Sequence, residues 1–271
     1  GSEYLSSTPK YNLLYEAFGW EIPKYIHVSP VMKDATKKLS KREGDASYED
    51  FIKKGYLKEA VVNYVVLLGW APKGDREKYT LDELVGIFDV DGISKSPAIF
   101  DEKKLAWLNG EYLRELPFEK FHEDALPFYK NVITNENIDL KKVSKLLQQR
   151  CEKLSDIPEQ IDFFDKLPEY ANDLYTHKKM KTNPENSLEA LKEALPVLEG
   201  IDEWNEENIH NELIKLVEKL ELKNGRILWP VRVAISGKAF TPGGAVEIAD
   251  ILGKDETVKR VKQGIVQLEN A

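Results

Sequence analysis

The most informative stretch of the sequence is residues 25–42, which read Tyr-Ile-His-Val-Ser-Pro-Val-Met, then Lys-Asp-Ala-Thr, then Lys-Lys-Leu-Ser-Lys-Arg. The part within Pro23–Met32 is short, rich in Tyr, Ile and Val, and flanked by proline, which predicts a strand. A polar loop follows over residues 33–46, and four of the six residues in Lys37–Arg42 are cationic. Lysine neutralises phosphate as a mobile charge and arginine can donate to two oxygens at once, so this loop suits a polyphosphate. The alternative for such a loop is solvated surface.

Outside this stretch the sequence predicts helices. Leu57–Leu68 is apolar on all sides, as in a buried helix, and Gly69 ends it. Ser47 with Asp50, and Thr80 with Glu83, have the spacing of capping boxes. A long amphipathic helix is expected over Ile138–Leu154, and five more helices over residues 187–198, 205–222, 227–235, 245–252 and 256–268. The predicted fold class is therefore mainly α with a small α/β part at the start.

Composition limits the class of protein. The 271 residues carry a formal net charge of -8, which opposes nucleic-acid binding unless the cations are clustered. Cys151 is the single cysteine, so no internal disulfide can form, and we expect it to pack as a small hydrophobe. The longest apolar run is too short to span a membrane. Gly1-Ser2 without methionine indicates a scar from tag removal, so the natural chain is expected to begin upstream.

Ordered motifs give the sequence a resemblance to bacterial glutamyl-tRNA synthetases over nearly its whole length. These enzymes write their second ATP signature as Lys-hydrophobic-Ser-Lys-Arg, which is Lys38-Leu39-Ser40-Lys41-Arg42 here. The other matching stretches include Ser6–Lys10, Leu14–Trp20, Leu67–Trp70, Trp107–Tyr112, Gly225-Arg226 and Thr241-Pro242. The resemblance implies that Lys38 and Lys41 are catalytic, and that Lys38, Ser40, Lys41 and Arg42 bind ATP.

The first ATP signature of that family, His-x-Gly-His, is missing. None of the four histidines, His27, His122, His177 and His210, is followed by Gly-His. Because catalysis depends on holding both substrates in register, we expect this chain to be inactive alone, as a C-terminal fragment of a glutamate–tRNA ligase. The resemblance implies ATP with Mg²⁺ for the full-length enzyme. We expect no cofactor on the fragment and no metal site, because no ligand cluster is visible.

The helical tail narrows the resemblance to the glutamyl enzymes. Glutaminyl-tRNA synthetases read the anticodon with β-barrels, and glutamyl-queuosine synthetases lack an anticodon module. The resemblance places Arg232, Thr241 and Pro242 at the anticodon. It also relates the helix around Arg150 to the one that faces the third anticodon base, with Lys153 as the alternative residue for that role. Core packing is expected for Trp204 and Trp229, because apolar residues flank both.

Pro117 and Asn183-Pro184 divide the chain, and the resemblance assigns its parts. Residues 1–46 are predicted to end a Rossmann-like catalytic domain, and 47–117 to form a helical stem-contact domain. Residues 118–182 and 183–271 are predicted to form two helical anticodon-binding subdomains. The expected partner is glutamate tRNA, with glutamine tRNA left open, for a cytoplasmic monomer with no membrane contact. Two alternatives are a natural non-catalytic tRNA-binding protein and a helical scaffold for protein partners.

Overall fold

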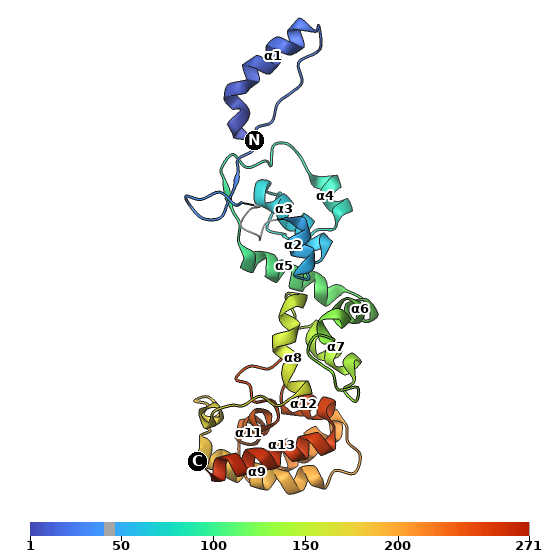
Figure 1. Ribbon diagram of the computed structural model, residues 1–271, viewed down its shortest axis with the longest axis vertical. Coiled ribbons are helices and arrows are strands. Elements are labelled where there is room, and N and C mark those ends of the chain that lie inside the picture. The colour runs from blue at the N-terminus through green and yellow to red at the C-terminus, as the bar shows by residue number, and fades with distance from the viewer. Residues whose placement is uncertain (41–46, 271) are drawn as a thin grey trace. The chain divides into compact units, whose positions relative to one another are not determined.

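The structure is a computed structural model that describes residues 1–40 and 47–270. The chain forms two compact units (Figure 1). Unit 1 comprises Gly1–Glu115 with Glu152–Ser155, and unit 2 comprises Leu116–Cys151 with Asp156–Ala271. The fold is mainly helical with one two-stranded parallel sheet among the described residues, so the predicted fold class is confirmed. No helix in those residues combines the length and apolar character needed to cross a membrane.

Unit 1 contains five α-helices and both short strands in its described part. Their bounds are α1 Thr8–Ala17, β1 Val31–Met32, α2 Tyr48–Lys53, α3 Lys58–Gly69, α4 Leu81–Ile87, β2 Ala98–Ile99 and α5 Glu102–Glu115. The two predicted capping boxes are present, at Ser47 before α2 and at Thr80 before α4. The core of this unit lies between α2, α3 and α5, where Phe51, Tyr64 and Leu105 are buried.

The predicted strand is wrong over residues 23–30. Only Val31 and Met32 are extended in a sheet, and they pair in parallel with Ala98 and Ile99. A strand needs a partner of matching length for its backbone hydrogen bonds, and β2 offers two residues. The chain over residues 20–30 has no regular secondary structure.

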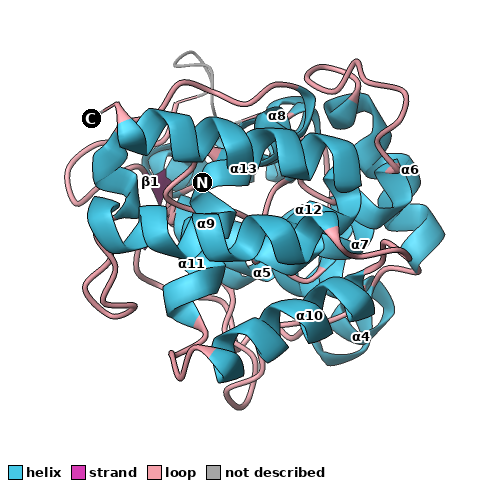
Figure 2. Cartoon of the chain, turned by 90° about the horizontal axis from the view of Figure 1, so that it is seen from below, coloured by secondary structure: helices cyan, strands magenta, loops and turns pink. Residues whose placement is uncertain are grey.

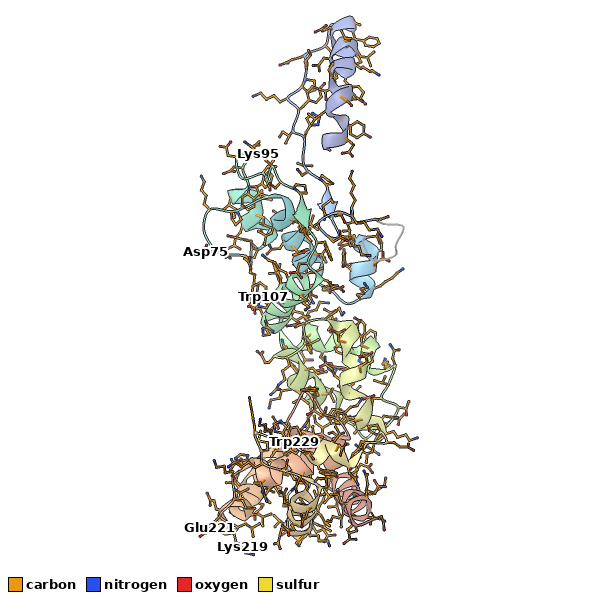
Figure 3. All side chains as sticks on the ribbon, turned by 90° about the vertical axis from the view of Figure 1, so that its left-hand side faces the viewer. Asp75, Lys95, Trp107, Lys219, Glu221 and Trp229 are labelled. Carbon is orange, nitrogen blue, oxygen red and sulfur yellow. The ribbon has the colours of Figure 1, made fainter. Side chains whose placement is uncertain are left out.

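Unit 2 is a set of eight α-helices in its described part. Their bounds are α6 Phe118–Tyr129, α7 Leu140–Gln148, α8 Ile157–Asp165, α9 Pro184–Glu199, α10 Glu206–Lys219, α11 Gly225–Ser236, α12 Ala245–Leu252 and α13 Lys254–Glu269. Helices α9 and α13 lie side by side, and α11 packs against both (Figure 2). Beyond α10, Glu221 adopts a left-handed conformation with φ 52°, close to Lys219 at the same end of the helix (Figure 3).

The predicted single helix Ile138–Leu154 is also wrong, because α7 ends at Gln148. The amides of Leu154 and Ser155 donate to the carbonyls of Gly55 and Lys54, and the carbonyl of Glu152 accepts from Asn109. These long-range bonds replace the i to i+4 bonds of a helix. Cys151 is fully buried, as expected for a small hydrophobe.

Candidate functional site

The basic loop begins on a tight turn after β1. The carboxylate of Asp34 accepts the amides of Thr36 and Lys37 at 2.8 and 2.9 Å, and these bonds hold its pKa below the ordinary value. The Leu39 amide then donates to the Val31 carbonyl at 3.0 Å, so the chain folds back along β1. Lys38 is exposed and Ser40 is half-buried. The predicted ATP-binding residues Lys41 and Arg42 lie outside the described residues.

Arg232 lies in the second half of α11, and its side chain faces the loop that follows the helix. Its Nη1 donates to the Thr241 hydroxyl at 2.7 Å, and its Nη2 donates to the Ala239 carbonyl at 3.0 Å. The guanidinium carbon lies 4.2 Å from the centre of the Trp229 ring, which is a cation–π contact. Arg232 is 8% exposed, and its burial lowers its pKa because leaving water disfavours the cation. The buried guanidinium therefore holds the loop in place.

Thr241 and Pro242 form a hydrogen-bonded turn at the end of this loop. The Thr241 hydroxyl accepts from Arg232 and donates to the Gly243 carbonyl at 2.7 Å. Pro242 is buried, and a Cβ added to Gly243 would lie 2.7 Å from the Leu146 side chain on α7. A larger residue at position 243 would therefore require the Leu146 side chain to shift. At its other end, α11 stops at Gly237, whose φ of 62° reverses the chain.

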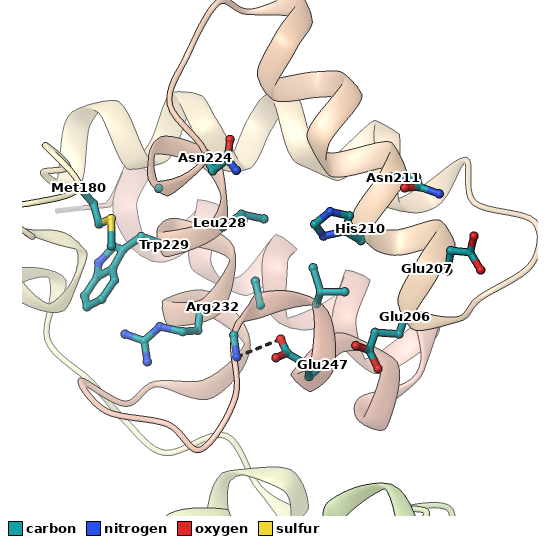
Figure 4. Close-up of a pocket in the computed structure, with 14 residues that line it drawn as sticks. Met180, Glu206, Glu207, His210, Asn211, Asn224, Leu228, Trp229, Arg232 and Glu247 are labelled. Carbon is teal, nitrogen blue, oxygen red and sulfur yellow. Dashed lines mark hydrogen bonds between the residues drawn. The ribbon is translucent and has the colours of Figure 1, made fainter. Parts of the chain in front are cut away.

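A cavity of about 950 Å³ opens beside Arg232, between α10, α11 and α12 (Figure 4). Trp229 and Arg232 line one side of it, and three carboxylates lie across from them: Glu206, Glu207 and Glu247. Glu247 accepts the Gly244 amide at 3.1 Å, which caps α12. A nucleobase has flat apolar faces and polar edges with both donors and acceptors, so an aromatic ring, a guanidinium and carboxylates together suit it.

Trp229 combines a packing role with a place in the cavity wall. Its indole N–H donates to the Leu174 carbonyl at 3.1 Å, and the His177 ring lies 4.0 Å from its own. The expected core packing therefore holds for the edge of the Trp229 ring that carries the indole N–H. The ring as a whole is half-buried and also contacts Arg232. Trp204 donates to the Ala249 carbonyl at 3.0 Å and lines none of this cavity.

Arg150 lies in the turn after α7, so the predicted position within a helix is wrong. Its Nη1 donates to the Leu146 carbonyl at 3.0 Å. It borders a neighbouring cavity of about 230 Å³ with Lys142 and Lys145, and Glu206 and Glu247 line both cavities. Arg232 is thus hydrogen-bonded to Thr241, and Arg150 borders the neighbouring cavity.

The carboxylate side of this site was not predicted from the sequence. Glu206, Glu207 and Glu247 sit in the first turns of α10 and α12, where acidic residues are ordinary helix-capping features. Only the packing of α10 beside α12 shows that they face Arg232. Within residues 1–40 and 47–270, no three His, Cys, Asp or Glu side chains are grouped to hold a metal ion.

Comparisons with known proteins indicate the family of the chain. The family described as "Anticodon binding domain" matches residues 120–265, and "tRNA synthetases class I (E and Q), catalytic domain" matches residues 1–107. The first match covers more than half of the chain, so the helical unit that carries Arg232 is an anticodon-binding domain of a class I synthetase.

Proteins of similar sequence and structure indicate which synthetase family the chain belongs to. The chain is 63% identical over 270 residues to a glutamate–tRNA ligase of Clostridium tetani, and 60% identical over 269 residues to that of Clostridium acetobutylicum. It covers 55% and 56% of those proteins, so it spans about half their length. A crystal structure of a glutamate tRNA ligase from Elizabethkingia meningosepticum superposes with a TM-score of 0.81 at 27% identity, over 99% of this chain and 56% of that one. The chain belongs to the glutamate–tRNA ligase family.

Proposed function

We propose that this chain is the anticodon-reading part of a glutamate–tRNA ligase, which attaches glutamate to its tRNA with ATP during protein biosynthesis. The observation that carries the proposal is the Arg232 site: a buried guanidinium that organises the Thr241-Pro242 turn beside a cavity lined by an aromatic ring and carboxylates. The guanidinium uses one N–H of each terminal nitrogen internally, which leaves its other donors for a base edge. Thr241-Pro242 would then offer a fixed turn to the neighbouring base.

Binding to tRNA, tested by filter binding at several salt concentrations, examines this proposal. Arg232→Ala should weaken binding of glutamate tRNA by about ten-fold, because a good bidentate base contact is worth roughly 1–3 kcal/mol. Binding of an unrelated tRNA should change much less. If both tRNAs weaken equally and the salt slope flattens, Arg232 contacts only phosphate. No binding of glutamate tRNA by the unmodified chain would contradict the proposal itself.

A matched control separates loop damage from lost recognition. Thr241→Val removes the hydroxyl that Arg232 contacts but keeps the guanidinium, so it tests the bond within the loop separately from the loss of the guanidinium. Lys215→Ala changes an exposed cation of α10 that pairs with Glu212 and lines neither cavity. We expect Thr241→Val to weaken glutamate tRNA less than Arg232→Ala does, and Lys215→Ala to leave it unchanged.

For the catalytic segment, we propose that Lys38 and Lys41 steady the phosphates of ATP, with Ser40 and Arg42 contributing donors. Mg²⁺ would bind together with ATP in the full-length enzyme. The chain carries no His-x-Gly-His motif, so we propose that it makes no glutamyl-adenylate alone. ATP–pyrophosphate exchange with glutamate and tRNA present should stay at background. Clear exchange by a pure sample would show that the chain holds a complete ATP site.

The remaining expectations extend this proposal. We propose that the chain is monomeric and cytoplasmic, and that its partner is glutamate tRNA. Parallel binding of glutamate tRNA and glutamine tRNA decides whether the site distinguishes them. A scaffold for protein partners, the rival function, predicts that neither tRNA binds.

A further inference from the structure

Phe240 is the most exposed of the large hydrophobic side chains in the described part of the chain. It is 93% exposed, against 74% for Val85, which is next. A lone exposed apolar side chain is common on protein surfaces, so exposure by itself needs no explanation. What distinguishes Phe240 is that the backbone on both sides of it is fixed.

The guanidinium of Arg232 donates hydrogen bonds to both sequence neighbours of Phe240. Arg232 donates to the carbonyl of Ala239 and to the side chain of Thr241, at 3.0 and 2.7 Å. Upstream, Lys238 forms an ion pair with Asp162 at 2.8 Å, and the Lys238 amide donates to Ser236 at 3.3 Å. The loop around Phe240 is therefore bonded to α8 through Lys238 and to α11 through Arg232. The Phe240 ring itself is exposed to solvent.

We propose that Phe240 stacks on an unpaired base of the tRNA anticodon loop. This inference rests on the proposed function and deepens it, because it names a residue that contributes to binding the same ligand. Unpaired bases present flat apolar faces, and proteins that bind them stack aromatic side chains on those faces. A ring on a preformed loop loses little conformational freedom on binding, so more of the stacking energy appears as affinity.

The surroundings of Phe240 favour a base over a protein partner. An anchor for a protein partner usually sits within a wider apolar patch. Phe240 instead has a lysine, an alanine and a threonine around it in the sequence, and its loop leads directly into the cavity wall formed by Arg232 and Gly244. Phe240 carries no polar atom, so its contribution is expected to tolerate any base at the stacked position.

Binding of glutamate tRNA to variants of the whole chain tests the inference. Phe240→Ala should weaken binding by about ten-fold, Phe240→Leu less, and Phe240→Trp should keep binding near that of the unmodified chain. The salt slope should stay the same in all three variants, because no phosphate contact is lost. Val266→Ala is a matched control, since Val266 is 56% exposed on α13. The melting temperature should not change with Phe240→Ala, because the ring buries almost nothing within the chain.

A coupling experiment identifies the stacked base. Glutamate tRNAs with an abasic site at each anticodon-loop position are measured against the unmodified chain and Phe240→Ala. At the stacked position the two losses should not add, because either change removes the same contact. Additive losses at every position, or unchanged binding by Phe240→Ala while the unmodified chain binds, overturn the stacking and leave the proposed function standing. If the unmodified chain binds no tRNA, both proposals fail together.

Discussion

Arg260 on α13 donates a hydrogen bond from Nη1 to the backbone carbonyl of Phe163 on α8, at 2.7 Å across 97 residues of sequence. The same nitrogen also reaches the carbonyl of Ile235 at 2.7 Å, and Nε pairs with Glu256 at 2.8 Å. The side chain is 1% exposed. These bonds satisfy carbonyls where α8 and α11 end, so one buried cation joins three helices of unit 2.

Arg260→Met is expected to destabilise unit 2. The variant keeps an apolar stem of similar length but leaves two buried carbonyls without their donor. Since a hydrogen bond to a charged group contributes about 1.5–3 kcal/mol, the loss should be about 3 kcal/mol in the free energy of unfolding. Urea denaturation followed by circular dichroism measures it. Lys262→Met on the same helix is the control, because Lys262 is exposed and pairs with Glu199 at the surface. Equal losses for both variants would contradict a special role for Arg260.

Gly264 should tolerate alanine poorly although it lies within a helix. A Cβ at Gly264 would lie 2.7 Å from the Tyr175 hydroxyl and 3.0 Å from the Ala234 Cβ, both buried. Overpacking of this kind costs about 1–3 kcal/mol, which exceeds the gain of up to about 1 kcal/mol in helix propensity. Gly86→Ala in α4 is the matched substitution, since nothing lies within 4 Å of its added Cβ. We therefore expect Gly264→Ala to lower and Gly86→Ala to raise the melting temperature of the unit concerned.

Asp165 should make stability depend on pH in the acid range. Its carboxylate accepts the amides of Thr134 and Asn135 at 2.6 and 2.9 Å, and these bonds lower its pKa in the folded state. A lowered pKa adds stability above the unfolded pKa of about 3.9, and this stability is lost as the pH falls through the folded pKa. Asp165 is near the surface, so Asp165→Asn should cost less than about 1 kcal/mol at pH 7.

The difference between Asp165→Asn and the unmodified chain should shrink as the pH falls from about 5 toward 3. Urea denaturation at several pH values measures that trend. Asp173→Asn serves as the control, because Asp173 is exposed in a short turn of the same unit. A difference that grows on acidification would have the wrong sign and exclude this account of Asp165.

The structural features predicted correctly from the sequence are those that depend on residues close together along the chain. The capping boxes at Ser47 and Thr80 involve residues three apart, so their spacing alone indicates where α2 and α4 begin. The amphipathic pattern likewise predicted α9 to α13 within a few residues. These features depend on neighbours along the chain, which the sequence displays directly.

Features set by distant partners were not predictable in the same way. The helix expected over residues 138–154 stops because Glu152, Leu154 and Ser155 bond to residues about 40 to 100 positions earlier. The carboxylates opposite Arg232 and the exposure of Phe240 depend on how helices pack, which no local pattern records. The predicted roles of Arg150, Arg232, Thr241 and Pro242 came from family resemblance, and they remain predictions for the binding experiments.

The last prediction is that Leu116–Ala271 folds by itself. Unit 2 has its own buried helices, and the Leu116 carbonyl accepts from Gln148 at 2.7 Å, so the boundary belongs at Leu116. Circular dichroism should show a helical protein with a cooperative thermal transition.

Residues 152–155 provide an internal check on that result. In the whole chain the amides of Leu154 and Ser155 bond to carbonyls of unit 1, and Asn109 donates to the carbonyl of Glu152. Leu116–Ala271 lacks all three partners, so these two amides should exchange with solvent deuterium faster than in the whole chain. Amides within α9, α11 and α13 should keep their protection, because their helical bonds lie wholly inside unit 2. Loss of protection in those three helices, or a disordered spectrum, would show that the core of unit 2 requires residues before Leu116.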